Sequence, residues 1–595
     1  MTRIFDDPAD FADDQLAGFL DLYADRLRGA PGGVVAHRGE RAQVAVVIGG
    51  GSGHYPAFCG TVGPGMASGA VVGNVFTSPS AAQVYSVAKA ADQGLGVVLS
   101  FGNYAGDVLN FRIAAERLRA EGIDCRIVVV TDDLASAEEE DRRRGIAGDF
   151  TVFKVMGAAA AEGLGLDEVE RLGRAANAAT RSLGVAFAGC TLPGAGQPLF
   201  EVPEGHLGLG LGIHGEPGIE EVPVPSAGGL AELLVERILA AAPAGAGRRV
   251  GAILNGLGAT KYEELFLLWG RVSAELRRRG IELVDPEVGE LVTSLDMGGC
   301  SLTLIWLDEE LEPRWRADAY TPAFRKSRAP LAGLRTAEGP AGAAAAATVP
   351  EASAAARQLA QRVREALAAV HRTMLEHEER LGRIDAVAGD GDHGRGMVRG
   401  SQFAAARAEE VAAAGAGAGW LLQQAGQSWA EHAGGTSGVL WGAALESFGR
   451  ALDDRAESYT AAEVAAGVRA FADAVSGLGQ ASPGDKTMLD ALLPFADALS
   501  RATDGGTGLG AAWRSAAEEA TLAAEATSGL RPRIGRARPL ADRSLGTPDA
   551  GAVSLALIAT AVGELLAAPA GRAVPGGRLE PGRPSEPSRE EVGTA

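Results

Sequence analysis

A stretch rich in proline, glycine and alanine, residues 330–356, divides the chain into two blocks with different periodicities. It contains almost no bulky apolar side chain that could anchor a core, which is typical of a linker. Residues 569–595 are also rich in proline and glycine and predict a disordered tail. The 595 residues therefore predict two large folded blocks, residues 1–329 and 357–568.

In the first block, short β-branched runs alternate with helical patterns. Val44–Ile48, Gly96–Ser100 and Cys125–Thr131 predict buried strands, and Ser80–Gln93 has the three- and four-residue spacing of a helix. This alternation indicates an α/β domain with a largely parallel sheet. A second group of strands is predicted at residues 250–254, 281–284 and 302–307, with a helix at 261–279. The block therefore predicts two α/β lobes, divided near residue 185.

The second block has helical periodicity and almost no strand pattern. Segments rich in Ala, Leu, Glu and Arg, separated by Gly-rich turns, indicate six to eight helices. They are residues 357–382, 411–433, 461–478, 489–503, 509–527 and 550–567. The predicted fold class is therefore multidomain, with a two-lobed α/β domain followed by an all-helical domain.

Charge and cysteine usage exclude several classes of protein. The 55 basic and 76 acidic residues give a net charge of −21, which argues against a nucleic-acid or anionic-membrane binder. The four cysteines are widely spaced and favour reduced thiols over a zinc site or disulfides. The N-terminus is acidic, unlike a signal peptide, and residues 552–568 are too short and too polar for a membrane span. We expect a cytoplasmic protein without a nucleic-acid or membrane partner.

A glycine-rich turn, GGGSGHYP at residues 49–56, follows the first predicted strand. Its backbone N–H groups can face an oxygen-rich ligand, and neither the P-loop nor the GxGxxG pattern fits it. His54 stands at the end of the strand, where a histidine is well placed for acid/base chemistry. A tight strand-to-helix turn without a ligand is the alternative.

Two further motifs carry polar residues beside glycines. In FGNYAGD, residues 101–107, Asp107 follows another predicted strand and either caps a helix or lies near His54. In LGLGLGIHGEPG, residues 207–218, the glycines leave His214 open to a small ligand. Both residues are therefore candidates for a binding or catalytic site.

In the second block, a carboxylate-rich loop, DAVAGDGDHG at residues 385–394, follows the first predicted helix. Asp385, Asp390 and Asp392 would repel one another unless a cation lay between them. Oxygen ligands on a glycine-rich loop suit Mg²⁺, which keeps positions for phosphate oxygens. Calcium is the competing cation, but the spacing does not fit an EF-hand, and a solvated turn is the remaining alternative.

Three more turns of small hydroxyl residues lie in this block: GGTSG (434–438), SPGDKTM (482–488) and DRSLGTPD (542–549). Such turns at one end of a helical bundle can cradle phosphates without a P-loop. Arg543 could neutralise phosphoryl charge. Together with the carboxylate loop, these turns predict a nucleotide site.

These motifs resemble the dihydroxyacetone kinase family. GGGSGHYP, FGNYAGD, GLGIHGEPG and TSLDMGGCSLTL (293–304) are similar to its substrate half, and GDGDHG, GGTSG, GDKTMLDAL and ADRSLGTPDAGA to its nucleotide half. Both halves on one chain are similar to the ATP-dependent members. The resemblance implies an eight-helix barrel for the nucleotide and a homodimer.

The resemblance also implies roles for residues. His214 would hold a ketose carbonyl as a covalent hemiaminal, Asp107 would take the proton of the terminal hydroxyl, and His54 would assist. Gly51, Ser52 and Gly53 would complete the substrate site, and Asp385, Asp390 and Asp392 would bind Mg²⁺. ATP would lie among His393, Gly394, Arg395, Thr436, Ser437, Gly484, Thr487, Met488, Arg543, Thr547, Pro548 and Asp549.

Three positions depart from the common family pattern: Tyr55 replaces Glu, Gly102 replaces a Lys that contacts the substrate, and Arg395 stands in Gly-Arg-Gly after the metal loop. The first two favour a roomier pocket and a four-carbon ketose, erythrulose, over dihydroxyacetone. A ketose-sensing regulatory binder and a lyase that cyclises FAD are the more distant alternatives. The regulatory binder would not need the carboxylate loop, and the lyase would not need His214.

Overall fold

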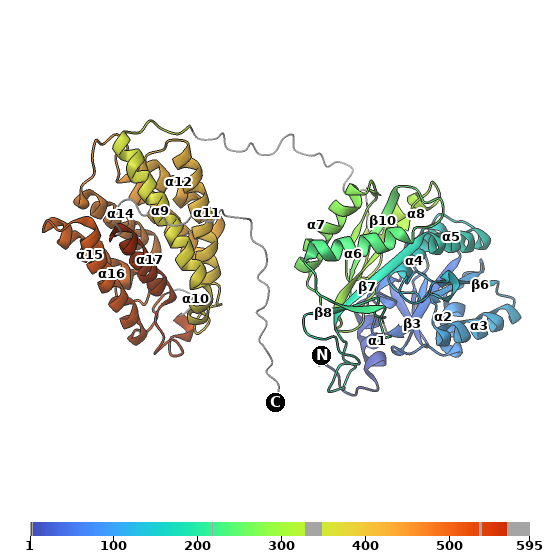
Figure 1. Cartoon of the computed structure of the whole chain (residues 1–595). Helices are drawn as coiled ribbons and strands as arrows, with labels where there is room; N and C mark the ends of the chain where they lie inside the picture. The colour runs from blue at the N-terminus through green and yellow to red at the C-terminus, as the bar shows by residue number, and fades with distance from the viewer. Residues whose placement is uncertain (1, 3, 217, 328–347, 535–537, 568–595) are drawn as a thin grey trace, which may run out of the picture. The chain divides into compact units, whose positions relative to one another are not determined.

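The computed structural model describes residues 2, 4–216, 218–327, 348–534 and 538–567 (Figure 1). It contains two compact units, residues 1–336 and 337–595. Residues 330–347 of the expected linker, and the expected tail at 569–595, lie outside the described residues. Helix α9 (Ala354–Glu376) begins within the expected linker, because the Ser353 hydroxyl caps it by accepting a hydrogen bond from the N–H of Ala356 at 2.9 Å.

The first sheet of the N-terminal unit has the strand order β1-β2-β4-β3-β5-β6. Its strands are β1 (Leu27–Ala30), β2 (Gly33–Ala36), β3 (Ala45–Ser52), β4 (Gly69–Val75), β5 (Val97–Gly102) and β6 (Cys125–Val130). β4, β3, β5 and β6 are parallel, as predicted, with α2 (Ala81–Ala91) and α3 (Ala105–Ala120) in the connections. The carboxyl ends of β3 and β5 therefore lie side by side, which brings the segments after Ser52 and Gly102 together.

The second sheet has the order β11-β10-β13-β7-β8-β9, with β12 beside β10. Its strands are β7 (Thr180–Ala188), β8 (His206–Leu209), β9 (Glu220–Pro223), β10 (Arg249–Gly256), β11 (Glu282–Leu283), β12 (Glu287–Gly289) and β13 (Gly298–Trp306). It is mainly antiparallel, so the largely parallel arrangement expected for the block holds for the first sheet only. β7, β8 and β9 follow one another without a helix between them, which permits antiparallel pairing. The expected division near residue 185 falls inside β7.

Helix α4 (Gly148–Ala161) packs against both sheets, touching β3, β5 and β6 of the first and β7 and β13 of the second. All residues from Gly148 to Ala160 are buried, which explains the small and apolar side chains of this helix. Its one lysine, Lys154, donates a hydrogen bond to the carbonyl of Arg314 at 2.8 Å. α2 and α3 cover the outer face of the first sheet, and α6 (Ala227–Ala240) and α7 (Tyr262–Arg278) that of the second (Figure 1).

The described residues of the C-terminal unit form helices and connecting loops, with no strand among them. Its helices are α9, α10 (Glu378–Asp385), α11 (His393–Ala413), α12 (Ala418–Ala433), α13 (Gly435–Arg450), α14 (Ala461–Gly479), α15 (Leu489–Asp504), α16 (Leu509–Ala526) and α17 (Ala550–Ala567). The sequence analysis did not predict α11 as a helix of its own, and it did not predict α13. Both begin with glycine-rich sequence, HGRG and GGTSG, which resembles a turn.

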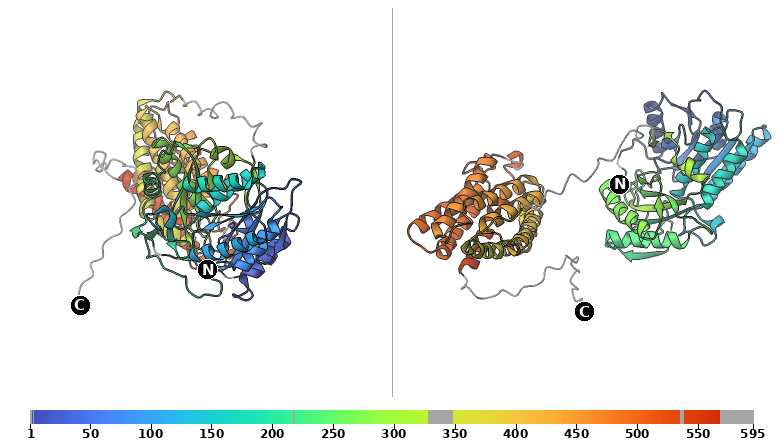
Figure 2. Two further views of the ribbon diagram at one scale, coloured as in Figure 1. Left: turned by 90° about the vertical axis from the view of Figure 1, so that its right-hand side faces the viewer. Right: turned by 90° about the horizontal axis from the view of Figure 1, so that it is seen from above.

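The eight long helices, α9 and α11–α17, form a closed ring. Each packs against the next along the chain, and α17 packs against α9. Figure 1 shows these helices side by side, and Figure 2 shows them from two further directions. Neighbouring helices run antiparallel: His371 and Arg364 of α9, for example, contact Ser401 and Glu409 of α11 in reverse order along the chain. This is the eight-helix barrel that the family resemblance implied.

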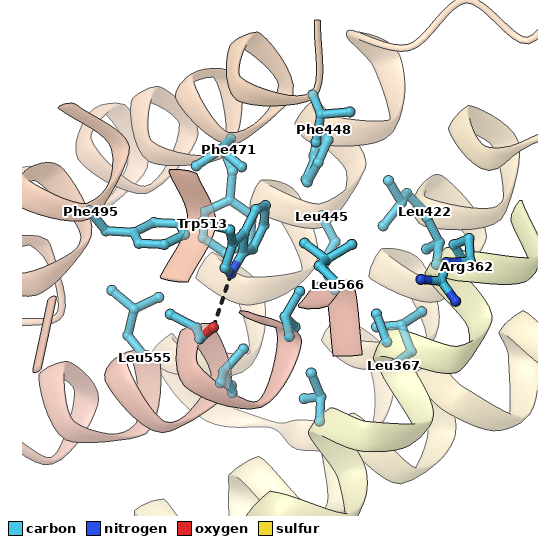
Figure 3. A pocket seen from close by; sticks show the side chains of 18 of the residues that line it. Arg362, Leu367, Leu422, Leu445, Phe448, Phe471, Phe495, Trp513, Leu555 and Leu566 are labelled. Atoms are coloured by element: carbon cyan, nitrogen blue, oxygen red, sulfur yellow. Dashed lines mark hydrogen bonds between the residues drawn. The ribbon is translucent and has the colours of Figure 1, made fainter. Parts of the chain in front are cut away.

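The barrel interior holds an apolar cavity of about 180 Å³ (Figure 3). Leu422, Phe471, Trp513 and Leu555 are among the side chains that line it. The indole N–H of Trp513 donates to the carbonyl of Ala559 at 2.9 Å, so the buried ring keeps a polar partner. None of the predicted nucleotide residues lines this cavity.

Contrary to the expectation from the sequence, helix α17 is long and apolar enough, by length and composition alone, to cross a membrane. In this unit it packs against α16, α15 and α9 instead. Its buried residues include Ala552, Val553, Leu555 and Ala559. Burial in the helical ring therefore accounts for its apolar composition.

Candidate active site

Two histidines from different sheets meet in the N-terminal unit. His54 follows β3 of the first sheet, and His214 lies in the loop between β8 and β9 of the second. Their Nε2 atoms are 3.0 Å apart, and His54 is only 3% exposed. The segment at Thr293 joins the two loops, because the Thr293 carbonyl lies 2.7 Å from His54 Nδ1 and the Ser294 hydroxyl donates to the carbonyl of Ile213.

The ring of His54 is enclosed by aromatic side chains. Phe76 stacks on it with ring centroids 5.0 Å apart and planes 23° apart, and Phe76 also meets the ring of His214 edge-on at 5.1 Å. Burial, together with the electrostatic effect of the nearby His214 ring, lowers the pKa of His54 to about 3. His54 is therefore neutral near neutral pH and can accept a proton.

His214 has an acidic partner on its other ring nitrogen. Its Nδ1 lies 3.0 Å from Glu216 Oε1, and its backbone N–H donates to Glu216 Oε2 at 3.0 Å. Arg144 lies 3.6 Å from the same carboxylate and is held by Asp133 at 2.9 Å. Although burial opposes it, the hydrogen bond and charge of His214 lower the pKa of Glu216 to about 2.

Asp107 lies in the first turn of α3, which follows β5. Burial raises its pKa to about 6, against the opposing effects of Ser78 and His214. One carboxylate oxygen of Asp107, the hydroxyl of Ser52 and the hydroxyl of Tyr104 are buried and have no hydrogen-bond partner among the described residues. Because buried polar groups are normally paired, these atoms fit a pocket whose ligand supplies hydroxyl groups.

The glycines of the GGGSG turn allow close backbone packing beside His54. A Cβ at Gly51 would stand 2.6 Å from the backbone nitrogen of Thr77, and one at Gly53 would stand 2.8 Å from the ring of Phe76. Gly53 also has a φ of +99°, which side chains rarely adopt. Gly51, Ser52 and Gly53 directly precede His54 at the end of β3, and their part in a substrate site stays a prediction.

The structure shows what lies beside Tyr55 and Gly102, the two departures that favoured a roomier pocket. Tyr55 is 43% exposed and packs toward Phe19, with ring centroids 6.2 Å apart, rather than toward His214. A Cβ at Gly102 would stand 3.1 Å from the ring of Tyr104, whose centroid is 4.9 Å from that of His214. The room directly beside Gly102 is therefore taken by an aromatic ring, and the wider pocket stays a prediction.

The three aspartates of the carboxylate loop come together in the C-terminal unit. Oxygen atoms of Asp385, Asp390 and Asp392 lie within 4.8 Å of one another. Asp385 ends α10 and accepts a hydrogen bond from the N–H of Gly391 at 2.9 Å, which folds the loop back on itself. Three carboxylate oxygens in one cluster fit a hard divalent cation such as Mg²⁺.

The predicted nucleotide residues gather at one end of the helical ring. Because successive helices run antiparallel, the N-termini of α11, α13, α15 and α17 lie at the same end. This set comprises His393, Gly394 and Arg395 on α11, Thr436 and Ser437 on α13, Gly484, Thr487 and Met488 before α15, and Thr547, Pro548 and Asp549 before α17. Helix N-termini offer N–H groups and positive partial charge to phosphates.

The GGTSG segment is not a turn, contrary to the prediction. Gly434 precedes α13 with a φ of +68°, and Thr436 and Ser437 lie exposed in the first turn of that helix. Two glycines with positive φ end α12 and start α13 without a longer loop, which is why the sequence looked like a turn.

The N–H groups of the SPGDKTM loop are not open, as the sequence had suggested. The carboxylate of Asp490 accepts hydrogen bonds from the N–H groups of Gly484 and Thr487, the latter at 2.8 Å. Lys486 is buried, and its ammonium donates to the Ser544 carbonyl at 2.7 Å and to the Leu530 carbonyl at 3.2 Å. The loop is therefore held by its own side chains.

The DRSLGTPD segment combines exposed and buried groups. Arg543 is exposed and reaches solvent at this end of the ring. Asp549 accepts a hydrogen bond from the N–H of Ala552 at 2.8 Å at the start of α17, and burial raises its pKa to about 6. Thr547, Pro548 and Asp549 line a cavity of about 50 Å³ together with Asp385 and Lys486.

Sequence reasoning missed several groups of the site, among them Glu216, Thr293, Phe76 and Tyr104. Glu216 had a local signal, because it stands two residues after His214 in the same glycine-rich motif. Phe76 had none, because a single aromatic residue after a strand is ordinary core sequence.

Comparison with known proteins agrees with this arrangement. Residues 17–323 match the Dak1 domain and residues 387–564 match the DAK2 domain. A D-erythrulose kinase of Mycolicibacterium smegmatis is 58% identical over 573 residues, covering 95% of this chain and 98% of the relative. An L-erythrulose kinase of Pectobacterium atrosepticum is 53% identical, covering 95% and 97%.

A solved structure is similar over nearly the full length of the chain. The dihydroxyacetone kinase from C. freundii in complex with AMP-PNP and Mg²⁺ has a TM-score of 0.58 at 29% identity, covering 95% of this chain and 99% of that chain. The family models span both units, and the relatives span nearly the full length. The chain therefore belongs to the dihydroxyacetone kinase family, with its Dak1 and DAK2 domains fused in one polypeptide.

Proposed function

We propose that this protein is an ATP-dependent kinase that phosphorylates a terminal hydroxyl of a short-chain ketose, with erythrulose as the favoured substrate. The observation that carries the proposal is the meeting of His54 and His214, 3.0 Å apart, beside buried unpaired oxygen atoms of Ser52 and Asp107. The relatives named as D- and L-erythrulose kinases support the choice of sugar. Dihydroxyacetone is the alternative substrate.

In the substrate half, His214 forms a covalent hemiaminal with the ketose carbonyl, so that ketones are selected over polyols. His54 is neutral and buried, and it transfers the proton that passes from His214 to the carbonyl oxygen during this addition. Asp107 takes the proton of the terminal hydroxyl as that oxygen attacks the γ-phosphate. Ser52 and the backbone of Gly51 and Gly53 line the sugar.

In the nucleotide half, Asp385, Asp390 and Asp392 hold Mg²⁺, which neutralises phosphate charge when it is bound. ATP lies at the end of the ring where the N-termini of α11, α13, α15 and α17 gather. The related C. freundii kinase, whose structure was solved in complex with AMP-PNP and Mg²⁺, supports this assignment. Arg395 and Arg543 add positive charge for the phosphates.

Two broader properties complete the proposal. We propose a cytoplasmic location, which is consistent with the similarity of the chain to erythrulose kinases. We also propose a homodimer, which follows from the family resemblance. Light scattering on the purified protein measures its mass and tests the dimer.

The function is tested by ADP release from Mg-ATP with D-erythrulose, L-erythrulose, dihydroxyacetone and glycerol. We expect turnover with the ketoses, highest with an erythrulose, and none with glycerol. The His214→Ala variant should lose ketose phosphorylation while any cyclisation of FAD persists. Absence of ADP release with every ketose would overturn the kinase assignment.

A further inference from the structure

The hydrogen bonds around His54 fix where its proton lies. His54 Nδ1 is 2.7 Å from the carbonyl of Thr293, which can only accept, so Nδ1 carries the hydrogen. Burial lowers the pKa of His54 to about 3, so the ring is neutral and its Nε2 has a free lone pair. His54 therefore accepts a hydrogen bond at Nε2.

The contact between the two histidines fixes one proton of His214. The two Nε2 atoms are 3.0 Å apart, a distance that needs one hydrogen between them. Because His54 Nε2 is the acceptor, His214 Nε2 is the donor and carries a hydrogen.

The contact with Glu216 fixes the second proton of His214. Its Nδ1 is 3.0 Å from Glu216 Oε1, and Glu216 is ionised, since its pKa is lowered to about 2. A carboxylate can only accept, so His214 Nδ1 also carries a hydrogen. With hydrogens on both nitrogens, the ring of His214 is an imidazolium cation.

The surroundings of His214 favour this cation. Glu216 is held at 3.6 Å by Arg144, which Asp133 fixes in turn. Asp107 contributes negative charge from α3. Tyr104 and Phe76 meet the ring edge-on, at 4.9 and 5.1 Å, and carry no charge near neutral pH.

We propose that Glu216 is the counter-ion and positioning residue that keeps His214 an imidazolium both before and after the ketose is attached. This role rests on the proposed function, because it concerns the covalent step at His214. Glu216 does not touch the sugar in this scheme; it acts only through the ring of His214.

The attachment step balances without a net proton. The Nε2 proton of His214 passes to Nε2 of His54, and the freed lone pair forms the C–N bond to the ketone carbon. The carbonyl π electrons move to the oxygen, which takes the proton back from His54 and becomes the hemiaminal hydroxyl. The product is an Nε2-substituted imidazolium with a hydrogen on Nδ1, so its charge equals that of the starting ring.

Two consequences follow from this constant charge. Formation of the adduct requires no proton from solvent, so its equilibrium is independent of pH while the imidazolium and the Glu216 carboxylate persist. Removing the negative charge of Glu216 destabilises both cationic forms. An opposite charge at this distance favours the charged form by about 1–3 pK units, so its removal disfavours the cationic adduct relative to a neutral, unattached ring.

The first test measures the adduct with dihydroxyacetone labelled with ¹³C at the carbonyl, in the full-length protein. In the wild type, the hemiaminal signal should be constant from about pH 6 to 8. In Glu216→Gln it should fall at least about tenfold at the upper end and vary with pH, and Glu216→Asp should restore the wild-type profile in part. A wild-type adduct fraction in Glu216→Gln at every pH would overturn the proposal.

A second measurement is independent of any variant and of the ketose. The ¹⁵N spectrum of His214 in the ligand-free wild type should show two protonated ring nitrogens near neutral pH. A lone-pair nitrogen in that ring would contradict the proposal. If no adduct forms in the wild type, the proposed function fails, while the ¹⁵N spectrum still decides the charge state of His214.

Discussion

A methyl group at Gly102 would stand 3.1 Å from the ring of Tyr104, and that ring in turn lies against His214 with centroids 4.9 Å apart. Gly102 therefore gives Tyr104 its place in the pocket wall rather than leaving an open space. The same methyl would stand 3.0 Å from the carbonyl of Gly145, so the neighbouring backbone limits how far it can shift.

Gly102→Ala should accordingly push Tyr104 toward the substrate. Overpacking of this kind costs about 1–3 kcal/mol, so we expect KM for the ketose to rise about tenfold while KM for ATP is unchanged. Steady-state kinetics with each substrate varied in turn measures both. Unchanged ketose kinetics would mean that the ring of Tyr104 can move without cost.

The pH profile should report Asp107. Its pKa is raised to about 6 by burial, and a general base acts only when deprotonated. We therefore expect kcat/KM for the ketose to fall about tenfold per pH unit below pH 6 and to level off above it. Asp107→Asn should be inactive across the range, and a flat wild-type profile between about pH 5 and 7 would exclude Asp107 as the base.

Asp490→Asn should weaken nucleotide binding. The carboxylate of Asp490 accepts from the N–H groups of Gly484 and Thr487, and an amide keeps only one accepting oxygen. Loss of a charge-assisted hydrogen bond costs about 1.5–3 kcal/mol, so KM for ATP should rise at least about tenfold. Asp497→Asn is the matched control, because Asp497 lies exposed on the same helix and pairs with Arg469. Equal effects of the two changes would contradict the role of Asp490.

Asp392→Asn should raise the Mg²⁺ concentration that activity requires. Asp392 precedes α11, but its side chain makes no capping hydrogen bond, so the change removes charge without removing a cap. We expect the half-saturating Mg²⁺ concentration to rise about tenfold or more in ADP-release assays. Chelation by EDTA should abolish wild-type activity. Asp542→Asn, which alters an exposed carboxylate paired with Arg531, should behave like the wild type.

The sequence predicted those parts of the fold that have a local signal. The β3, β5 and β6 strands and helix α7 are continuous apolar or amphipathic segments, and they appear within a few residues of the predicted bounds. Helices α11 and α13 were missed because their first turns are rich in glycine, where propensity favours a turn. Tertiary packing in the ring stabilises those helices, and no local pattern reveals it.

The site shows the same division. His54, Asp107, His214 and the three clustered aspartates lie in motifs, so their residue types and glycine neighbours identified them. The pairing of His54 with His214 joins positions 160 residues apart, and only the packing of the two sheets brings them together. The filling of the space at Gly102 by Tyr104 depends on the path of one loop, which residue types do not determine.

The antiparallel ring of the C-terminal unit sorts its connections into two sets. One set lies at the end proposed to bind ATP, which limits changes in its sequence and length; it comprises residues 385–392, 434, 482–488 and 543–549. The other set connects the helices at the opposite end and comprises residues 414–417, 451–460 and 505–508. Lengthening a surface loop costs little free energy, since the entropy of closure grows slowly with length. The connections at the opposite end can therefore vary in length between relatives without disturbing phosphoryl transfer. They could also carry a genetically inserted fluorescent reporter.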